Sequence, residues 1–200
     1  IFILALAFIL PATAEPSANS STKPISDPQV LVKSISDDVL AKILANKAKL
    51  SEGPAFLSAL IERKMLPIID QNRMAKMALG KPWKTISDQQ KSDFIEGFKS
   101  LLINTYSGAF KAYTGQEVTL DDTKYNKKGN RAIVRSAIHV AGGTPVRLQY
   151  RLYLTKSGQW LVYDANIAGL GLLKTYRIRF AEQIQRDGVD KTISDLLNLR

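Results

Sequence analysis

The sequence contains no cysteine, and His139 is the one histidine among its 200 residues. The lack of cysteine excludes disulfides, thiol catalysis, iron–sulfur ligation and a lipid anchor attached to a cysteine. Also missing are a glycine-rich phosphate loop, the H-E-x-x-H metal motif and the G-x-S-x-G nucleophile motif. A histidine metal site would have to combine His139 with carboxylates alone. Because His139 lies out of phase with Ile138 and Val140, beside a turn, we expect an exposed strand histidine, with neither a metal site nor a cofactor.

The chain has no apolar run long enough to cross a bilayer, which takes about 20 residues. The apolar run over residues 1–10 is about half that length, and Pro11 and the small residues Ala12-Thr13-Ala14 follow it. We interpret residues 1–14 as the remainder of a secretory signal peptide cleaved near Ala14, in preference to a membrane anchor. We therefore expect an exported protein.

Acidic residues are scarce, because 18 Asp and Glu face 28 Lys and Arg and leave a formal net charge of +10. Such a charge would ordinarily suggest a nucleic-acid partner, but an exported protein rarely meets nucleic acid. Phospholipid headgroups, a membrane surface or an acidic patch on a protein are the anionic partners we expect, and a merely solubilising surface is the alternative.

The N-terminal half has helical periodicity after a polar segment, residues 15–27, which we interpret as a flexible linker. Apolar spacing predicts helices over residues 28–49, after Gly53-Pro54, and from Ile68 to Leu79. Ser87 and Gln90 form a predicted capping box for a long helix that ends at Gly115.

After Gly115 the apolar period changes to two, which predicts strands. Four are expected, over 117–120, 132–140, 146–154 and 160–164, and the short turns between them require antiparallel pairing. A helix that ends at Gly188 and another from about Asp190 follow. We therefore predict an α+β fold, with an antiparallel meander of about four strands backed by several helices, in a single domain over residues 28–200.

Asp164 is the best candidate for a general base, since it shares strand parity with Trp160 and Val162 and so is expected to be partly buried. An aspartate at a strand end more often accepts backbone N–H bonds or pairs with an arginine. We therefore favour a structural role for Asp164 and keep an α+β enzyme acting on a small hydrophobic substrate as the alternative.

The apolar faces of the predicted sheet and helices either pack together as a core or line a cavity. The sequence does not distinguish the two, because a core and a cavity use the same side chains at the same periods. A basic membrane- or partner-binding module with a solid core is thus a further alternative. These residues are Ile69, Met74, Met77, Leu79, Phe94, Phe98, Leu101, Leu102, Val134, Ile138, Leu148, Tyr150, Leu152, Val162 and Leu173.

Residues 160–180 carry a recognisable pattern: W-x-V-Y-D over Trp160–Asp164, I-x-G from Ile167, the pair Tyr176-Arg177, and Phe180. Upstream, residues 66–83 carry L-P-x-I-D, R-M-A and L-G-x-x-W. Together these motifs resemble the periplasmic phospholipid-binding proteins of the Mla lipid-transport system, the toluene-tolerance family. The chain departs from many members at residues 168–171, where A-G-L-G replaces E-G-V-S and removes a carboxylate and a hydroxyl.

The resemblance implies a phospholipid carrier of the Gram-negative periplasm, acting as a monomer without a cofactor and not as an enzyme. Acyl chains would occupy an apolar cavity lined by the apolar residues given above together with Leu170 and Tyr176. Lys174, Arg177 and Arg179 are the candidate contacts for a headgroup or partner, arginine being the better bidentate donor to phosphate. Such carriers shuttle phospholipid between an outer-membrane lipoprotein complex and an inner-membrane ABC transporter with MCE-type subunits, which maintains outer-membrane lipid asymmetry.

Overall fold

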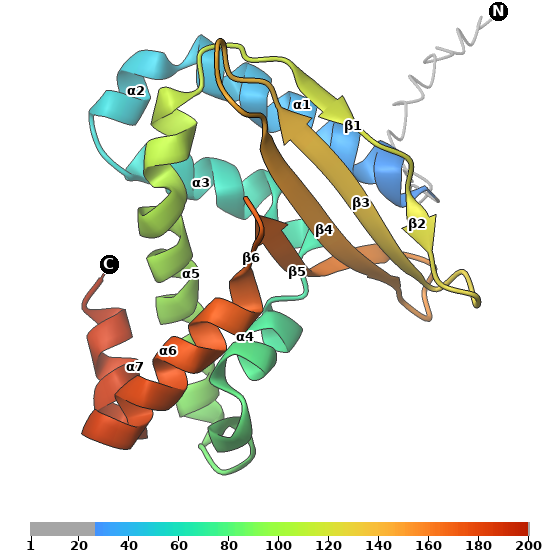
Figure 1. Cartoon of the computed structure of the whole chain (residues 1–200). Coiled ribbons are helices and arrows are strands. Elements are labelled where there is room, and N and C mark those ends of the chain that lie inside the picture. Colours follow the sequence, from blue (N-terminus) through green and yellow to red (C-terminus); the bar gives the residue numbers. More distant parts are fainter. Residues whose placement is uncertain (1–26, 200) are drawn as a thin grey trace, which may run out of the picture.

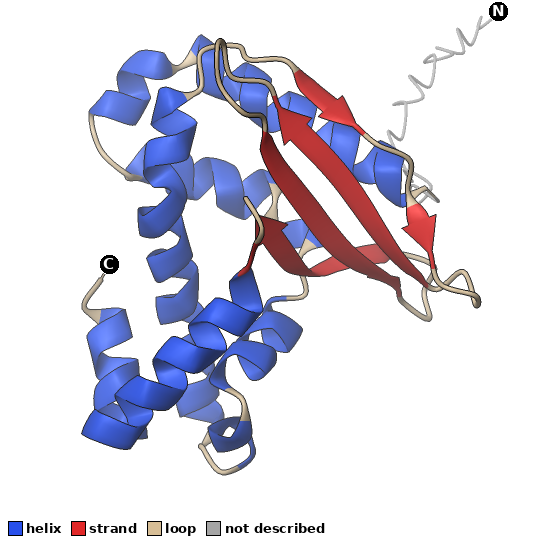
Figure 2. Cartoon of the chain, viewed as in Figure 1, coloured by secondary structure: helices blue, strands red, loops and turns tan. Residues whose placement is uncertain are grey.

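The structure is a computed structural model that describes residues 27–199. The predicted signal-peptide remnant, and the predicted linker apart from Asp27, lie outside the described residues. The fold is α+β, as predicted (Figures 1 and 2). Its elements are α1 (Pro28–Ala45), α2 (Lys47–Ser51), α3 (Ala55–Lys64), η1 (Leu66–Ile68), α4 (Gln71–Leu79), η2 (Lys81–Lys84), α5 (Asp88–Ala112), β1 (Val118–Leu120), β2 (Lys124–Tyr125), β3 (Arg131–Ile138), β4 (Val146–Leu154), β5 (Trp160–Ile167), β6 (Leu170–Gly171), α6 (Leu172–Asp187) and α7 (Val189–Leu197).

The sheet is an antiparallel meander in the order β1-β3-β4-β5-β6. The short strand β2 also pairs with β3, nearer the start of β3 than β1 does. It has six strands, whereas the sequence predicted about four. The two strands that were missed, β2 and β6, contain two residues each, which is too short for an alternating pattern to show. The four longer strands were all predicted.

Three of the predicted helix boundaries are wrong. The first predicted helix breaks at Asn46, whose side-chain amide donates to the Lys42 carbonyl, so α1 and α2 are separate. The segment from Ile68 is not helical throughout: Ile69 is extended and pairs with Val162 at the edge of β5, and α4 begins after the N-cap Asp70. The predicted capping box of α5 is confirmed, but α5 ends at Ala112.

The two faces of the β3–β4 hairpin differ sharply. Its inner face carries even-numbered residues, from Ala132 on β3 and from Val146 on β4, and α1 packs against it (Figure 1). Its outer face carries the odd-numbered residues, and no helix packs over it in the view of Figure 2. Alternation of burial along β3 follows this division, since Ala132, Val134 and Ser136 are buried and their neighbours are not.

The buried apolar side chains form three clusters. The helical cluster joins α4, α5, α6 and α7; the sheet cluster joins α1 to β3, β4 and β5; the α1–α3 cluster joins α1, α2, α3 and α5. Ile69 packs against both the helical and the sheet clusters, and Ile35 against both the sheet and the α1–α3 clusters. A domain more often has one contiguous core, so the side chains at the junctions between these clusters are candidates for a binding site.

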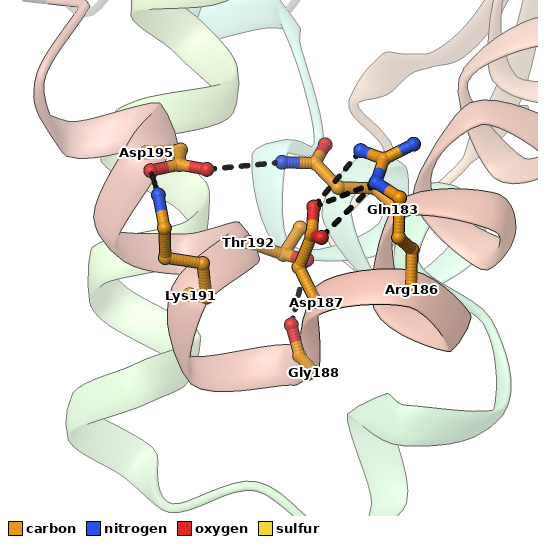
Figure 3. A network of polar contacts seen from close by, with 7 residues as sticks. All are labelled: Gln183, Arg186, Asp187, Gly188, Lys191, Thr192 and Asp195. Atoms are coloured by element: carbon orange, nitrogen blue, oxygen red, sulfur yellow. Dashed lines mark hydrogen bonds and ion pairs between the residues drawn. The ribbon is translucent and has the colours of Figure 1, made fainter.

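The helical cluster is held by a close approach of α5 to α7. A Cβ added at Gly97 would lie 2.6 Å from Cβ and 3.0 Å from the carbonyl carbon of Leu196, so only glycine fits there without a shift of α7. The α6–α7 corner is fixed by polar contacts (Figure 3): the buried Thr192 hydroxyl donates to the Gly188 carbonyl at 2.8 Å, and Gln183 donates to Asp195 at 3.4 Å.

Candidate functional site

The end of the sheet beside α5 carries apolar side chains that the three clusters do not fully bury. Ile138 on β3, Leu148 on β4 and Ile167 on β5 lie on the inner face here, with Leu148 paired to Ile167, and all three are half-buried. Leu101 and Leu102 of α5 are half-buried as well and pack against the helical cluster. In Figure 1, α5 runs past this end of the sheet, and Ile167 packs against the same helical cluster as Leu101 and Leu102. These five half-buried residues make up the candidate apolar site.

Most of the predicted lipid-binding residues are more deeply buried than these. Six belong to the helical cluster: Met74, Leu79, Phe94, Phe98, Leu173 and Tyr176. Three belong to the sheet cluster, namely Val134, Leu152 and Val162, and Ile69 lies at the junction of the two clusters. Met77 and Leu170 are 37% and 69% exposed. The structure therefore collects these residues in two packed groups, a half-buried group at the sheet end and two exposed positions, and their contact with lipid stays a prediction.

Aromatic rings pack closely against one another within the helical cluster. The Phe94 ring lies 5.1 Å from that of Phe180 and 5.8 Å from that of Phe98, and Phe98 lies 5.2 Å from Tyr176. These centroid separations are within the range of favourable stacked and edge-to-face pairs.

A pocket of about 220 Å³ lies between the α2–α3 turn and α5. It is smaller than the 300–1,000 Å³ of typical ligand pockets. None of the predicted lipid-binding residues lines it. Its lining is Leu50, Gly53, Pro54, Leu57, Asn104, Ser107 and Lys111. It does not correspond to the predicted cavity.

One polar group interrupts the inner face of the sheet. The Tyr150 phenol of β4 lies near the hydroxyls of Ser136 of β3 and Ser36 of α1. Burial raises the pKa of Tyr150, and interaction with these two hydroxyls acts in the opposite direction. Ser136 is itself only 5% exposed. Tyr150 was predicted from its apolar parity, and no sequence signal pointed to its two serine partners.

The three predicted headgroup or partner contacts all lie exposed on α6, but not on one flank. The Arg177 guanidinium lies against Gly80, with Nε 3.2 Å from the position of an added Cβ, whereas Arg179 lies over the Tyr176 ring, 5.5 Å from its centroid. Positions i and i+2 of a helix do not face each other. Lys174 instead neighbours Ile178 (i, i+4), which is 52% exposed and was missed by the sequence reasoning.

Asp164 does not share the inner face with Val162. A β-bulge shifts the register between Arg151 and Leu152, so Asp164 pairs with Arg151 on the outer face and the predicted parity is wrong. Its carboxylate accepts hydrogen bonds from the N–H groups of Ala165 at 2.9 Å and Leu173 at 3.4 Å, and lies 3.7 Å from Arg151 Nε. Since α6 has no side-chain cap of its own at Gly171, Asp164 supplies the acceptor for its first turn.

We expect Asp164→Asn to lower the free energy of unfolding by about 1 kcal/mol, because it removes the negative charge at the N-terminus of α6 while keeping an acceptor oxygen. Thermal unfolding monitored by circular dichroism measures this. Bound phospholipid, counted by mass spectrometry of the same samples, should be unchanged. A loss of any catalytic turnover on this substitution would contradict the structural role.

A second anchor that sequence reasoning missed joins α4 to the sheet. The Arg73 guanidinium stacks between the rings of Tyr153 and Tyr163, 4.5 and 4.6 Å from their centroids. The Tyr153 hydroxyl donates to Asp70 at 2.6 Å, which raises the pKa of Tyr153, and Asp70 also caps α4 by accepting from the Arg73 N–H. An aspartate just before a helix signals an N-cap, but its tyrosine partner, Tyr153, lies 83 residues away and leaves no local signal.

His139 is exposed, as predicted, and its Nε2 lies 2.9 Å from the Thr119 hydroxyl. Within residues 27–199 no group of three or more His, Asp and Glu side chains is placed to hold a metal ion. No helix in this part of the chain combines the length and the apolar character needed to cross a bilayer.

The family model for MlaC protein matches residues 33–198, which is most of the chain. The chain belongs to the MlaC family. Among curated relatives, the intermembrane phospholipid transport system binding protein MlaC of Haemophilus influenzae is 26% identical over 173 residues, covering 86% of this chain and 81% of that protein. The toluene tolerance protein ttg2D of Pseudomonas putida is 30% identical over 170 residues, covering 83% and 78%.

Among solved structures, the fold matches a phospholipid-binding protein from Ralstonia solanacearum in complex with a phospholipid. The TM-score is 0.79 and the sequence identity 34%, with 86% of this chain and 96% of that chain covered. Membership of the MlaC family and the similarity to a phospholipid-binding fold agree with the resemblance carried by residues 66–83 and 160–180.

Proposed function

We propose that this chain is a periplasmic phospholipid-binding protein that carries phospholipid in an Mla transport system, without catalysing a reaction. The observation that carries the proposal is the similarity to the Ralstonia solanacearum protein, which was solved with a phospholipid bound. Two relatives whose names give intermembrane phospholipid transport and toluene tolerance support the same reading. The alternative with Asp164 as a catalytic base finds no support in its geometry, because that carboxylate is engaged by two backbone N–H groups and by Arg151.

Acyl chains are best accommodated at the end of the sheet beside α5. Ile138, Leu148 and Ile167 there are half-buried, so lipid can cover them without displacing a packed core. Leu170 is 69% exposed at the start of β6 and pairs directly with Ile167 of β5, so it extends this apolar surface outward. Lys174 comes four residues after Leu170 at the start of α6, within reach of a phosphate whose acyl chains lie on that surface.

The carrier role further implies exchange with two membranes. In the proposed cycle the protein, as a monomer, takes phospholipid from or delivers it to an outer-membrane lipoprotein complex and an inner-membrane ABC transporter with MCE-type subunits, and so maintains outer-membrane lipid asymmetry. Export through the signal peptide, with cleavage near Ala14, would place the chain in the periplasm of a Gram-negative bacterium.

The preference of phospholipid for such a carrier over a bilayer is a small difference between two large free energies of transfer from water. Moving about 30 methylenes of two acyl chains out of water gains roughly 25 kcal/mol at about 0.8 kcal/mol each. A bilayer offers nearly the same gain, so bound phospholipid should survive purification in water and be lost to detergent or to excess liposomes.

A vesicle transfer assay tests the function. Donor liposomes containing a fluorescent phospholipid are mixed with unlabelled acceptors, and we expect the transfer rate to rise in proportion to added protein. A protein without bound phospholipid that leaves the spontaneous transfer rate unchanged would contradict the carrier function.

A further inference from the structure

The outer face of the β3–β4 hairpin carries a row of arginines. Arg131 and Arg135 come from β3, and Arg147 and Arg151 from β4. The register sets each one diagonally across from the next, in the order Arg131, Arg151, Arg135, Arg147, with diagonal neighbours about 7–8 Å apart. Across the β3–β4 pairing, the residues directly opposite the four arginines are all uncharged, namely Tyr153, Ile133, Gln149 and Ala137. On the other side of β4, Arg151 is opposite Asp164 of β5. This arginine row therefore concentrates positive charge along the hairpin while avoiding the direct cross-strand opposition of like charges that would destabilise the sheet.

Little of this charge is neutralised within the protein. Arg151 Nε lies 3.7 Å from the Asp164 carboxylate, but that carboxylate also accepts a hydrogen bond from the Leu173 N–H in the first turn of α6. Over residues 27–199 no ion pair involves Arg131, Arg135 or Arg147, although Asp121 and Glu117 lie at the ends of the neighbouring strand β1. The row is thus a surface that an external anion can still satisfy.

The outer face lacks the apolar anchors of a protein–protein interface. Such interfaces have cores that are depleted in charge and enriched in aromatic and other large apolar side chains. None of the exposed large apolar residues of the described chain lies on the outer face of β3 or β4; the nearest in sequence, Val140, belongs to the turn between them. The two tyrosines at one end, Tyr153 and Tyr163, are already stacked on Arg73.

We propose that the arginine row is a docking surface for the anionic headgroups of a phospholipid bilayer. Arginine suits this role because its planar guanidinium binds phosphate oxygens in a bidentate manner. An open strand pair of eight to nine residues, about 26–30 Å long, presents the row to many headgroups at once. The surface differs from the apolar site, which lies on the inner face, so docking orients the carrier on a membrane without occupying its cargo site.

Vesicle flotation of the full mature chain tests this inference, with phosphatidylcholine vesicles and with vesicles that also contain anionic phosphatidylglycerol. We expect binding only to the anionic vesicles, lost at about 1 M salt, where the Debye length is about 3 Å. Each basic side chain near an anionic membrane is worth about fivefold in partitioning. The triple variant Arg131→Gln, Arg135→Gln, Arg147→Gln should therefore bind about 100-fold more weakly.

Two further variants show whether a loss of binding comes from the arginine row, from the lower net charge of the protein or from misfolding. The triple variant Lys49→Gln, Lys76→Gln, Lys84→Gln removes the same net charge from exposed helical positions and should bind within about fivefold of the unmodified chain. Replacing the same three arginines by lysine keeps the charge and should retain most of the binding.

Equal losses in the two glutamine variants, or no preference of the unmodified chain for anionic vesicles, would overturn the inference; the row would then be a surface for an acidic protein or for solvent. The inference rests on charge on the outer face and not on the proposed carrier function. Native mass spectrometry of the arginine-to-glutamine variant keeps the two apart, because we expect its bound phospholipid to be unchanged.

Discussion

Replacing Leu148 with tryptophan should displace the bound phospholipid and leave the protein folded, whereas Val162→Trp should destabilise the fold. Both residues lie on the inner face of the sheet. Leu148 is half-buried at the end beside α5, so a larger side chain there fills space that we assign to acyl chains. Val162 is 7% exposed within the sheet cluster, and overpacking a filled core costs about 1–3 kcal/mol or more.

The two variants control for each other, because each adds the same side chain to the same face of one sheet. Urea unfolding gives the free energy of unfolding, and native mass spectrometry gives the lipid content of the folded fraction. If both variants unfold and neither changes lipid content, Leu148 belongs to the core and the acyl chains lie elsewhere.

Gly97→Ala should destabilise the protein by about 1–3 kcal/mol and loosen α7. The added methyl group would lie 2.6 Å from Leu196 Cβ and 3.0 Å from the Leu196 carbonyl carbon, so α7 has to move away from α5. The destabilisation caused by this clash opposes the gain of up to about 1 kcal/mol in free energy of unfolding that alanine ordinarily brings in place of glycine within a helix.

Gly108→Ala, on the same helix, is the matched control. Its Cβ would meet nothing within 4 Å, so we expect only the propensity gain of about 0.5–1 kcal/mol. Urea unfolding measures both variants, and hydrogen exchange over residues 189–197 reports the loosening of α7. Stabilisation by Gly97→Ala of the size seen for Gly108→Ala would refute the close packing of α5 on α7.

Local patterns in the sequence were sufficient for the regular elements. The capping box of Ser87 and Gln90 placed the start of α5, and strict alternation placed β4, because both signals are contained within a few residues. The extended Ile69 was missed because it depends on a contact beyond the local pattern. The break at Asn46 was missed because the bond from its side chain to the Lys42 carbonyl, although local, leaves no mark in the apolar spacing. Ile69 leaves the helical pattern to pair with Val162, more than 90 residues along the chain.

The site was only partly predictable for a related reason. Parity placed Leu148 and Val162 on one face but could not show that one is half-buried and the other packed. Parity failed at Asp164, because a β-bulge inserts one extra residue and moves every later side chain to the opposite face. The arginines of the row stand four positions apart on each strand, and their diagonal arrangement depends on the register between β3 and β4, which the sequence does not show.

Native mass spectrometry of the protein purified gently, without detergent, tests the central claim most directly. The carrier account predicts a mass above that of the mature chain by a stoichiometric phospholipid, which solvent extraction releases and which excess liposomes remove. A bare polypeptide mass, together with no uptake when the protein is incubated with liposomes, would contradict the account and favour a basic binding module with a solid core.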